Sequence, residues 1–401
     1  MGNWAFALFL MLMSGGVLNA QTADSTPIDI SSSLGAIAAR TKIPGLAAIV
    51  LRGDRIVAEG VAGVRKNGSP ELITLHDQFQ LNSGTKAMTA TLAAIAVENG
   101  KLSWNTTLGD VFSSKVKKMK PAWKSVTLEQ LLDHRGGVPN EMSKIGPLLR
   151  IYCAKVPPPE QRRMLAKMLL SGSPAYTPGS KFVYSSLGYI LVGVMLETAT
   201  GRTWEDLMRE QLWQPLGITT GGFGAPGTPG KVDEPWGHWG GLIAGHPVPP
   251  WGFWARLNPP LFWGPGGNSY MTITDWAKFV AMHLRGDAAD PLHETHLFTA
   301  ESFQTLHRTV PGKFYESGWI LATRSWANGH RPGDTGRVLS SQGDNYFWHA
   351  EAWIAPEIDF AILVVVNEGG ATADKPAFKA SEEVVDTLAG EFANLNTTQR
   401  R

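Results

Sequence analysis

A serine and a lysine three residues apart stand where a long apolar segment begins, and these two residue types can together break an acyl bond. The chain reads Gln80-Leu-Asn-Ser83-Gly-Thr-Lys86 and continues as an uncharged run of good helix formers to Val97. A helix that is apolar nearly all round is buried. Because Ser83 stands where the apolar run begins, it is predicted at the N-terminus of this buried helix, with Lys86 on the same face. Burial favours the neutral amine of Lys86, which can take the proton of the weakly nucleophilic Ser83 hydroxyl.

The Ser-x-x-Lys spacing is not specific by itself. Ser114-Lys-Val-Lys117 has the same spacing within a polar, basic run, and we assign it no chemistry. Ser83 also has an alternative interpretation as a helix-capping serine. The choice between nucleophile and cap therefore depends on the rest of the chain.

A second candidate group is the phenol of Tyr184. A Pro178-Gly179 turn leads to this residue, which directly precedes a second apolar segment, residues 185–200, that ends at Gly201. A tyrosine at the start of a buried helix projects from a rigid position, and beside a lysine it can act as a general base. The alternative is a core aromatic residue with a satisfied hydroxyl.

These segments together resemble the penicillin-recognising serine hydrolases, a group of class C β-lactamases, D-alanyl-D-alanine peptidases and related esterases and small-peptide peptidases. The resemblance implies that Ser83 is the nucleophile, that Lys86 and Tyr184 accept and relay its proton, and that no cofactor or metal takes part. It covers about residues 30–390 and is carried by Ser83-Gly-Thr-Lys86, Tyr184-Ser-Ser186, Leu131–Pro139, Gly201–Gly217 and Gly266–Phe279.

The third motif of this family is a basic residue, then Thr or Ser, then Gly, on a sheet edge beside the serine. His349-Ala350-Glu351 supplies an imidazole but lacks the glycine, whereas Ser341-Gln342-Gly343 keeps the glycine and stands fifteen residues before Pro356, as the resemblance requires. We therefore assign Ser341-Gln342-Gly343. The backbone N–H groups of Ser83 and Asp344 are then expected to form the oxyanion hole.

Two positions depart from the family pattern. Ser341 replaces the basic residue, and Ser186 stands where asparagine is commoner. Without a cation at position 341, binding of penicillins or of free C-terminal carboxylates is expected to weaken, because a charge-assisted hydrogen bond is lost. Arg337 and His349 are the alternatives that could replace the missing charge.

A Gly- and Pro-rich stretch between Pro235 and Gly267 carries five tryptophans and two phenylalanines. Loops seldom hide so many indoles from water. Our hypothesis is that several of them line a large apolar substrate pocket above Ser83; the alternative is that they belong to the core. The expected substrate-binding residues are Ser186, Ser341, Gln342, Gly343, Trp239 and Trp254.

The order of sequence patterns predicts an α+β fold of the β-lactamase/transpeptidase-like type. Strand patterns near both ends would form one antiparallel sheet, flanked by terminal helices over residues 28–39 and 375–393, and the middle would form a mainly helical lobe. The expected organisation is a signal peptide (1–20), a linker (21–29), a single domain (30–393) with an α/β lobe (30–82 and 316–393) and a helical lobe (83–315), and a tail (394–401).

Composition limits the partners and the compartment. The 401-residue chain has 43% apolar residues and a net charge of +1, which argues against a nucleic-acid partner. The apolar run from Trp4 to Met13 predicts a signal peptide cleaved after Ala20, hence a periplasmic or secreted protein without stable membrane insertion; an uncleaved anchor is the alternative. Cys153, the single cysteine, excludes an internal disulfide and is predicted to be a buried, inert thiol.

The sequence thus predicts an exported acyl-serine hydrolase that cleaves an amide bond in a small hydrophobic peptide, non-ribosomal or containing D-residues. The alternatives are a carboxylic-ester hydrolase, a β-lactamase, and a non-catalytic cell-wall peptide-binding protein. The chain has no Gly-x-Ser-x-Gly elbow, which argues against an α/β-hydrolase. His293-Glu-Thr-His296 lacks the His-Glu-x-x-His spacing of a zinc site, so no metal is expected.

Overall fold

The computed structural model describes residues 26–140, 145–240, 245–251, 259–287, 297–309, 312–329, 331–370 and 374–393. The predicted signal peptide, the predicted tail, Trp254 and the segment His293–His296 lie outside the described residues. The helices are α1 (Ser31–Thr41), α2 (Thr85–Glu98), α3 (Leu108–Phe112), α4 (Leu128–Leu132), α5 (Ile145–Tyr152), α6 (Pro158–Ser171), α7 (Ser186–Thr200), α8 (Trp204–Leu207), α9 (Gly264–Gly267), α10 (Ile273–Asp287), α11 (Ala300–Leu306) and α12 (Pro376–Phe392). The strands are β1 (Ile28–Asp29), β2 (Gly45–Arg52), β3 (Arg55–Gly63), β4 (Gln78–Gln80), β5 (Gly222–Phe223), β6 (Gly237–Trp239), β7 (His246–Val248), β8 (Ser269–Thr272), β9 (Tyr315–Glu316), β10 (Trp319–Thr323), β11 (Arg337–Asp344), β12 (His349–Ala355) and β13 (Phe360–Val366).

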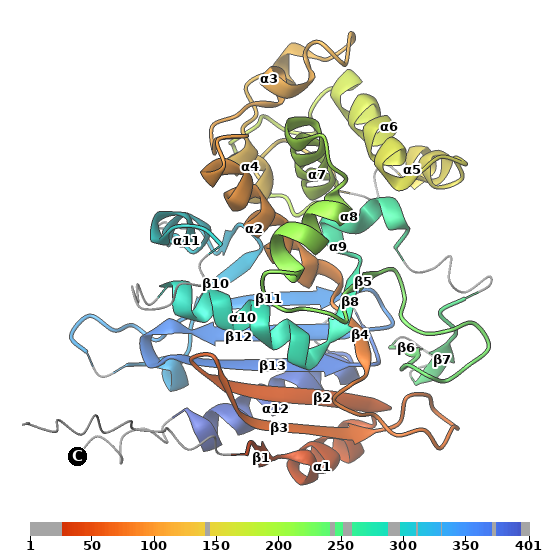
Figure 1. The fold of residues 1–401 in the computed structure, drawn as a ribbon, viewed down its shortest axis with the longest axis vertical. Coiled ribbons are helices and arrows are strands. Elements are labelled where there is room, and N and C mark those ends of the chain that lie inside the picture. The colour runs from red at the N-terminus through yellow and green to blue at the C-terminus, as the bar shows by residue number, and fades with distance from the viewer. Residues whose placement is uncertain are drawn as a thin grey trace, which may run out of the picture.

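The two ends of the chain meet in one eight-stranded sheet with the strand order β1-β3-β2-β13-β12-β11-β10-β9. Antiparallel pairing of β13 with β2 joins the N-terminal hairpin to the C-terminal strands, as predicted. One pairing differs from the prediction: β1 runs parallel to β3, so the sheet is antiparallel except at that edge. The helices α1 and α12 lie on one face of the sheet, while α10, α2 and the helices α3 to α7 lie toward the other (Figure 1).

The alternation of side chains along each strand divides the apolar residues into two cores. On β13, Ile362 and Val364 pack with α1 and α12, whereas Leu363 and Val365 pack in the core that contains α2, α7 and α10. On β11, Leu339 belongs to this second core. Since side chains alternate along a strand, Ser341 and Gly343 lie on the same face as Leu339 and point toward α2.

Two helices are buried, as their apolar sequences predict. Twelve of the fourteen residues of α2 are buried, as are twelve of the fifteen residues of α7. The short helix α4 begins with a capping box, in which Thr127 accepts from the backbone N–H of Gln130 and Gln130 accepts from that of Thr127. Each of these helices adjoins one segment of the candidate site: α2 begins within residues 82–86, α4 ends just before residues 133–139, and α7 begins at the end of residues 184–186.

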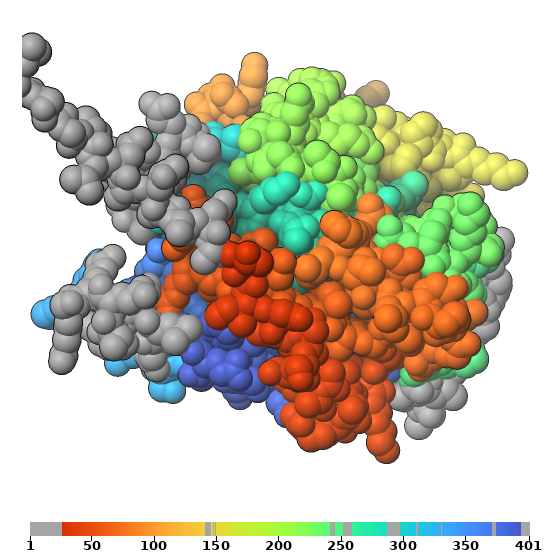
Figure 2. Space-filling view, turned by 60° about the horizontal axis from the view of Figure 1, so that its bottom comes forward, coloured from red at the N-terminus to blue at the C-terminus, as the bar shows by residue number. Residues whose placement is uncertain are grey.

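Two further features concern the surface. Red and orange residues of the N-terminal part of the described chain occupy the lower middle of the face seen in Figure 2, beside the violet residues of α12 and below the green residues. Cys153 was predicted to be buried, but its side chain is exposed, because it follows the last residue of α5 at the surface of the helical lobe. Within the described ranges, no helix is both long and apolar enough to cross a membrane.

Candidate active site

The backbone just before Ser83 holds an unusual conformation. Strand β4 ends at Gln80, and a 3₁₀ turn over Asn82–Gly84 leads directly into α2. Asn82 has a φ of +47°, in the left-handed region that asparagine tolerates better than most residues, and its Nδ2 donates to the carbonyl of Trp348 at 3.2 Å. This bond fixes the turn that presents Ser83 at the N-terminus of a buried helix. The sequence patterns alone did not identify this role of Asn82.

The hydroxyl of Ser83 contacts both predicted partners. Lys86 Nζ donates to Ser83 Oγ at 3.1 Å, and Tyr184 Oη donates to the same oxygen at 2.7 Å. Lys86 is only 1% exposed, whereas Tyr184 is 38% exposed. The structure therefore brings Tyr184 into contact with Ser83 although 101 positions separate them in the sequence. Of the two groups that contact the hydroxyl, Lys86 lies in the interior and Tyr184 is open to solvent.

The amine of Lys86 is held by three hydrogen bonds. Besides Ser83, it donates to Ser186 Oγ at 3.1 Å and to the carbonyl of Gly266 at 2.5 Å, and it lies 4.8 Å from the centre of the Tyr184 ring. A Cβ at Gly266 would lie 2.9 Å from Ser186 Cβ, so a larger residue would displace this carbonyl. Gly266 belongs to a phrase that carries the family resemblance, but its role as a lysine partner was not foreseen.

A buried histidine packs against Tyr184. The rings of His134 and Tyr184 are 4.4 Å apart, and His134 Nδ1 accepts from the backbone N–H of Ser185 at 3.1 Å. Burial, and then the charge of Lys86, lower the pKa of His134 well below its ordinary value. The imidazole is therefore neutral, and because Nδ1 accepts a hydrogen bond its single proton is on Nε2. The sequence analysis included this residue only within the segment Leu131–Pro139, which carries the family resemblance, and gave it no role of its own.

Three carboxylates near the site form ion pairs. Oxygens of Glu129, Asp133 and Glu316 lie within 4.8 Å of one another, an arrangement that could accept a cation. Lys313 pairs with Asp133 at 2.8 Å, and Arg308 pairs with Glu316 at 2.8 Å and also with Glu129. Burial, and then the charge of Glu316, raise the pKa of Asp133 to about 6. These pairs tie β9 to α4, and we assign no metal to the cluster.

Strand β11 passes directly beside Ser83. A Cβ on Gly343 would lie 2.7 Å from Ser83 N and 2.0 Å from the carbonyl oxygen of Leu81, so only glycine allows this approach. The backbone N–H of Asn345 donates to Trp348 across the β11–β12 turn. Because successive N–H groups of a strand point to opposite sides, the N–H of Asp344 points away from β12. The pairing of β10 with β11 covers residues 337–340, which leaves that side of Asp344 open toward Ser83.

Two of the residues predicted to bind substrate face in opposite directions. Ser341 points toward α2 and is 3% exposed, and its hydroxyl has no hydrogen-bond partner among the described residues. Gln342 points to the other face of the sheet, where its Nε2 donates to Glu351 Oε1 at 2.6 Å. The Gln342 side chain therefore faces away from Ser83, since a strand turns adjacent side chains to opposite faces, and only its backbone remains on the side of the candidate site.

Neither alternative cation stands at the place of the missing basic residue. Arg337 lies four residues before Ser341, roughly 13 Å along the strand at ~3.3 Å per residue, and it donates to the carbonyl of His307. His349 pairs directly with Asp344 and lies on the α12 face, where its ring contacts Phe378 at 4.8 Å. The prediction that one of them could replace the cation is not supported by their positions.

His349 instead forms a buried ion cluster behind the Asp344 backbone. Its Nδ1 lies 3.4 Å from Asp344 Oδ2 and its Nε2 lies 3.6 Å from Glu351 Oε2. Burial alone would lower the pKa of His349, but hydrogen bonding and charge from Asp344 and Glu351 outweigh it and raise the pKa to about 9. The histidine is therefore charged at neutral pH.

This cluster predicts how stability depends on pH. A histidine whose pKa is about 9 when folded and about 6.5 when unfolded stabilises the fold fully below pH 6.5, by about 3 kcal/mol, and this contribution is lost as pH rises through 9. The His349→Gln variant is expected to lose both the stabilisation and the decline between pH 6.5 and 9. Urea unfolding at pH 6, 8 and 10 measures this, with exposed His246→Gln as the control. An unchanged alkaline decline in His349→Gln would contradict the assignment.

Among the tryptophans of the Gly- and Pro-rich stretch that the structure describes, Trp239 lies near the end of β11. Trp239, on β6, lies parallel to the ring of Tyr346, with centroids 6.3 Å apart. Trp236 packs edge-on against Trp251 at 4.9 Å. Tyr346 follows Asp344 by two residues, and sequence reasoning did not select it because a single exposed tyrosine carries no pattern.

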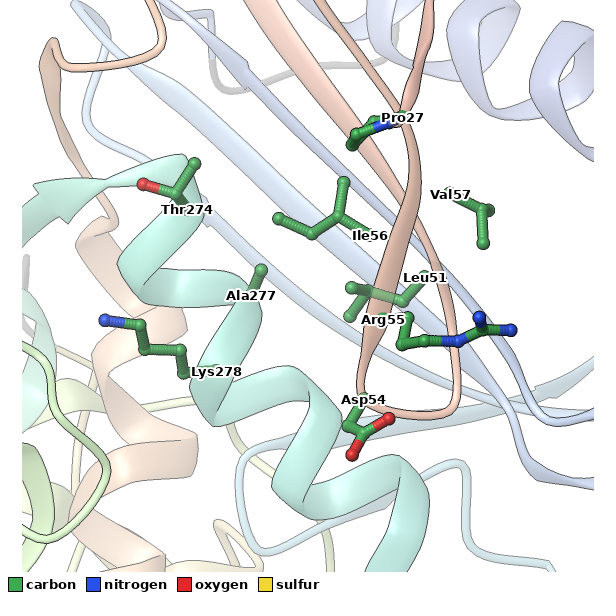
Figure 3. A pocket seen from close by; sticks show the side chains of 9 residues that line it. All are labelled: Pro27, Leu51, Asp54, Arg55, Ile56, Val57, Thr274, Ala277 and Lys278. Carbon is green, nitrogen blue, oxygen red and sulfur yellow. The ribbon is translucent and has the colours of Figure 1, made fainter. Parts of the chain in front are cut away.

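A cavity of about 380 Å³ lies elsewhere, between the β2–β3 hairpin and α10 (Figure 3). Its charged side chains are Asp54, Arg55 and Lys278, and the rest of its wall is formed by Pro27, Leu51, Ile56, Val57, Thr274 and Ala277. It contains none of the residues predicted to take part in chemistry, so we assign it no catalytic role.

The fold and the contacts of Ser83 define a serine hydrolase. The sequence profile of the family described as "Beta-lactamase" matches residues 33–385, and the chain belongs to this family. The predicted resemblance and the predicted β-lactamase-like fold are therefore confirmed.

Relatives of known description agree with this. The chain is 26% identical over 292 residues to "Penicillin-binding protein 4" of Amycolatopsis lactamdurans, covering 72% of this chain and 70% of that one. It is 23% identical to an "Unguisins hydrolase" of Aspergillus campestris over 82% of this chain, but it spans only 59% of that protein. The octameric penicillin-binding protein homologue from Pyrococcus abyssi superimposes with a TM-score of 0.68 at 20% identity, covering 89% of this chain and 76% of that one, and supports the fold.

Proposed function

We propose that this serine hydrolase is exported and cleaves an amide bond in a small hydrophobic peptide through an acyl-enzyme on Ser83. The observation that carries the proposal is the contact of one hydroxyl with two basic groups, at 3.1 Å to Lys86 Nζ and 2.7 Å to Tyr184 Oη. Both distances allow direct proton transfer. Export rests on the predicted signal peptide over residues 1–20.

In this mechanism, Ser83 Oγ attacks the substrate carbonyl carbon while its proton passes to Lys86 in its neutral amine form or to Tyr184 in its phenolate form, because only these forms have a lone pair to accept it. The carbonyl oxygen becomes an oxyanion, which the N–H groups of Ser83 and Asp344 stabilise. The C–N bond then breaks, and the proton is delivered to the leaving amine; Tyr184 is suited to this step because it is open to solvent. Water next attacks the acyl-enzyme, the same groups accept its proton, and Ser83 is regenerated as the acid leaves.

An amide in a peptide is favoured over a β-lactam by Ser341, which cannot form an ion pair with the carboxylate of a penicillin. The name of the Aspergillus relative, a hydrolase of unguisins, is consistent with this preference. An ester hydrolase uses the same three groups and is the second candidate. A non-catalytic peptide-binding protein would keep the fold but would not need a serine in contact with two bases.

Labelling with a fluorophosphonate tests the proposal. Stoichiometric labelling of Ser83 is expected, and the Ser83→Ala variant is expected to lose labelling and hydrolysis of p-nitrophenyl acetate. Ser114→Ala is the matched control, because Ser114 belongs to the second Ser-x-x-Lys match and lies on an exposed turn. Absence of labelling in the folded protein would favour the binding-protein alternative, and faster turnover of esters than of any blocked peptide would favour the esterase.

A further inference from the structure

Exposed aromatic side chains gather around Ser83. Among the described residues, the large exposed apolar side chains include three aromatic ones, Tyr184, Phe314 and Tyr346, which are 38%, 54% and 58% exposed. Tyr184 contacts Ser83 itself. Phe314 and Tyr346 have no part in the chemistry described above, and exposed apolar groups that gather in one place mark binding surfaces.

Phe314 continues an aromatic surface that starts at Tyr184. Tyr184 packs edge-on against Tyr315 at 6.4 Å, Tyr315 contacts Phe182 at 5.7 Å, and Phe182 contacts Phe314 at 4.8 Å. Tyr315 pairs with Ile320, which in turn pairs with Ser340 on β11. The surface formed by Phe182, Phe314 and Tyr315 therefore lies on the β9 side of β11, at a distance of about two strand spacings, or roughly 10 Å.

Tyr346 lies beyond the opposite end of the site, where β11 ends. Its φ is +74°, a left-handed conformation that tyrosine rarely adopts. Two hydrogen bonds hold it: its N–H donates to Asp344 Oδ1 at 2.8 Å, and its carbonyl accepts from the N–H of Gly240 at 3.2 Å. Its ring is backed by Trp239 in a parallel arrangement. An exposed aromatic ring is thus fixed two residues beyond Asp344, past the end of β11, whereas Tyr315, next to Phe314, is in register with Ser340 near the middle of that strand.

The strand between the two aromatic groups carries an uncharged, buried serine at the position of the family's basic residue. Ser341 Oγ has no partner among the described residues, and a Cβ on Gly84 would lie 3.9 Å from it. Arg337 and His349 both point elsewhere, as their contacts with His307 and Phe378 establish. A free carboxylate would find no ion-pair partner at Ser341, whereas an uncharged segment of a peptide needs none.

We infer that the site binds an uncharged internal segment of a peptide, with an aromatic or similarly bulky apolar side chain on each side of the scissile bond. One such side chain packs on Phe314 and Phe182, and the other packs on Tyr346. This inference rests on the proposed function, because it specifies the substrate of Ser83. It makes the enzyme selective for interior bonds of apolar peptides rather than for a C-terminal residue with a free carboxylate.

Binding to the Ser83→Ala protein tests the inference without turnover. The probes are acetyl-Gly-Phe-Phe-Gly-amide, its Ala-Ala analogue, and acetyl-Phe-Phe with a free C-terminal carboxylate, each with L- or D-residues at the two central positions. Titration calorimetry is expected to give about 10- to 100-fold tighter binding for the amide with two phenylalanines than for the analogue with two alanines, and no gain from the free carboxylate. Equal affinities for Phe and Ala peptides in both series would overturn the inference.

Variants of Tyr346 and Phe314 test whether each of these residues binds one of the two peptide side chains. Tyr346→Ala and Phe314→Ala, each combined with Ser83→Ala, are expected to weaken binding of the Phe-Phe amide about 10-fold and to leave the Ala-Ala amide unchanged. Tyr346→Phe keeps the ring and is expected to retain affinity. Ile28→Ala is the matched control, because Ile28 is 54% exposed but lies on β1 at the far edge of the sheet.

The two proposals fail in different ways. Turnover of p-nitrophenyl acetate by the native protein, together with equal binding of Phe and Ala peptides, would refute the aromatic positions alone. Selective binding of the Phe-Phe amide without labelling of Ser83 would support the aromatic positions and refute the hydrolase mechanism.

Discussion

The Lys86→Met variant is expected to lose kcat/KM by about 10⁴-fold or more while the fold is retained. Methionine keeps an unbranched apolar stem of similar length but removes the amine that contacts Ser83, Ser186 and Gly266. The hydroxyl of Ser83 would then have only Tyr184 as a basic partner. The measurement is kcat/KM for p-nitrophenyl acetate beside the thermal unfolding midpoint, so that a loss of activity is separated from a loss of fold.

Three comparisons make this result decisive. Because residues that act as one unit have non-additive effects, the double variant Ser83→Ala/Lys86→Met is expected to be no less active than Ser83→Ala alone. Lys117→Met removes the lysine of the other Ser-x-x-Lys match, which is exposed, and is expected to change nothing. A Lys86→Met enzyme within 10-fold of the native rate would show that the amine is not needed for proton transfer.

The fold could be predicted because several independent patterns agree. The uncharged segment after Lys86 can only be a buried helix, and the strand patterns at both ends of the chain can only pair with each other. The register of the strands and the face on which each side chain lies were harder to predict from the sequence. The positions of Gln342 and His349 on the α12 face follow from the pleat of β11 and β12, and the sequence could not place the faces because both are buried.

Within the candidate site, the predicted residues that the structure brings into contact are those whose types carry chemistry, namely Ser83, Lys86 and Tyr184. The groups that position them were missed for a physical reason. Gly266 acts through a backbone carbonyl, Asn82 through its left-handed backbone, and neither function leaves a pattern in residue types. Cys153 was misplaced for a similar reason, since cysteine is usually buried and nothing local indicated that α5 ends at the surface.

The Gly343→Ala variant is expected to lower kcat by about 10²- to 10³-fold, the usual cost of one lost oxyanion donor. The new methyl group would lie 2.0 Å from the carbonyl oxygen of Leu81 and 2.7 Å and 2.9 Å from the backbone nitrogens of Ser83 and Gly84. These are backbone atoms, which cannot rotate away, so β11 must move from the Ser83 turn. The N–H groups of Ser83 and Asp344 would then no longer converge on one oxygen. The φ of Gly343 is not in the left-handed region, so the collision is the only cause of the effect.

A second glycine gives the matched control for this substitution. Gly35 lies within α1, and a Cβ there would meet no atom within 4 Å, so Gly35→Ala is expected to keep full activity and to stabilise the fold by about 0.5–1 kcal/mol. Overpacking at Gly343 is expected to destabilise by about 1–3 kcal/mol, which leaves the protein folded at 25 °C if its stability is ordinary. Steady-state kinetics and the rate of fluorophosphonate labelling at this temperature are therefore expected to fall together in Gly343→Ala. If both rates instead stay within threefold of the native values, the oxyanion is held by groups other than the N–H groups of Ser83 and Asp344.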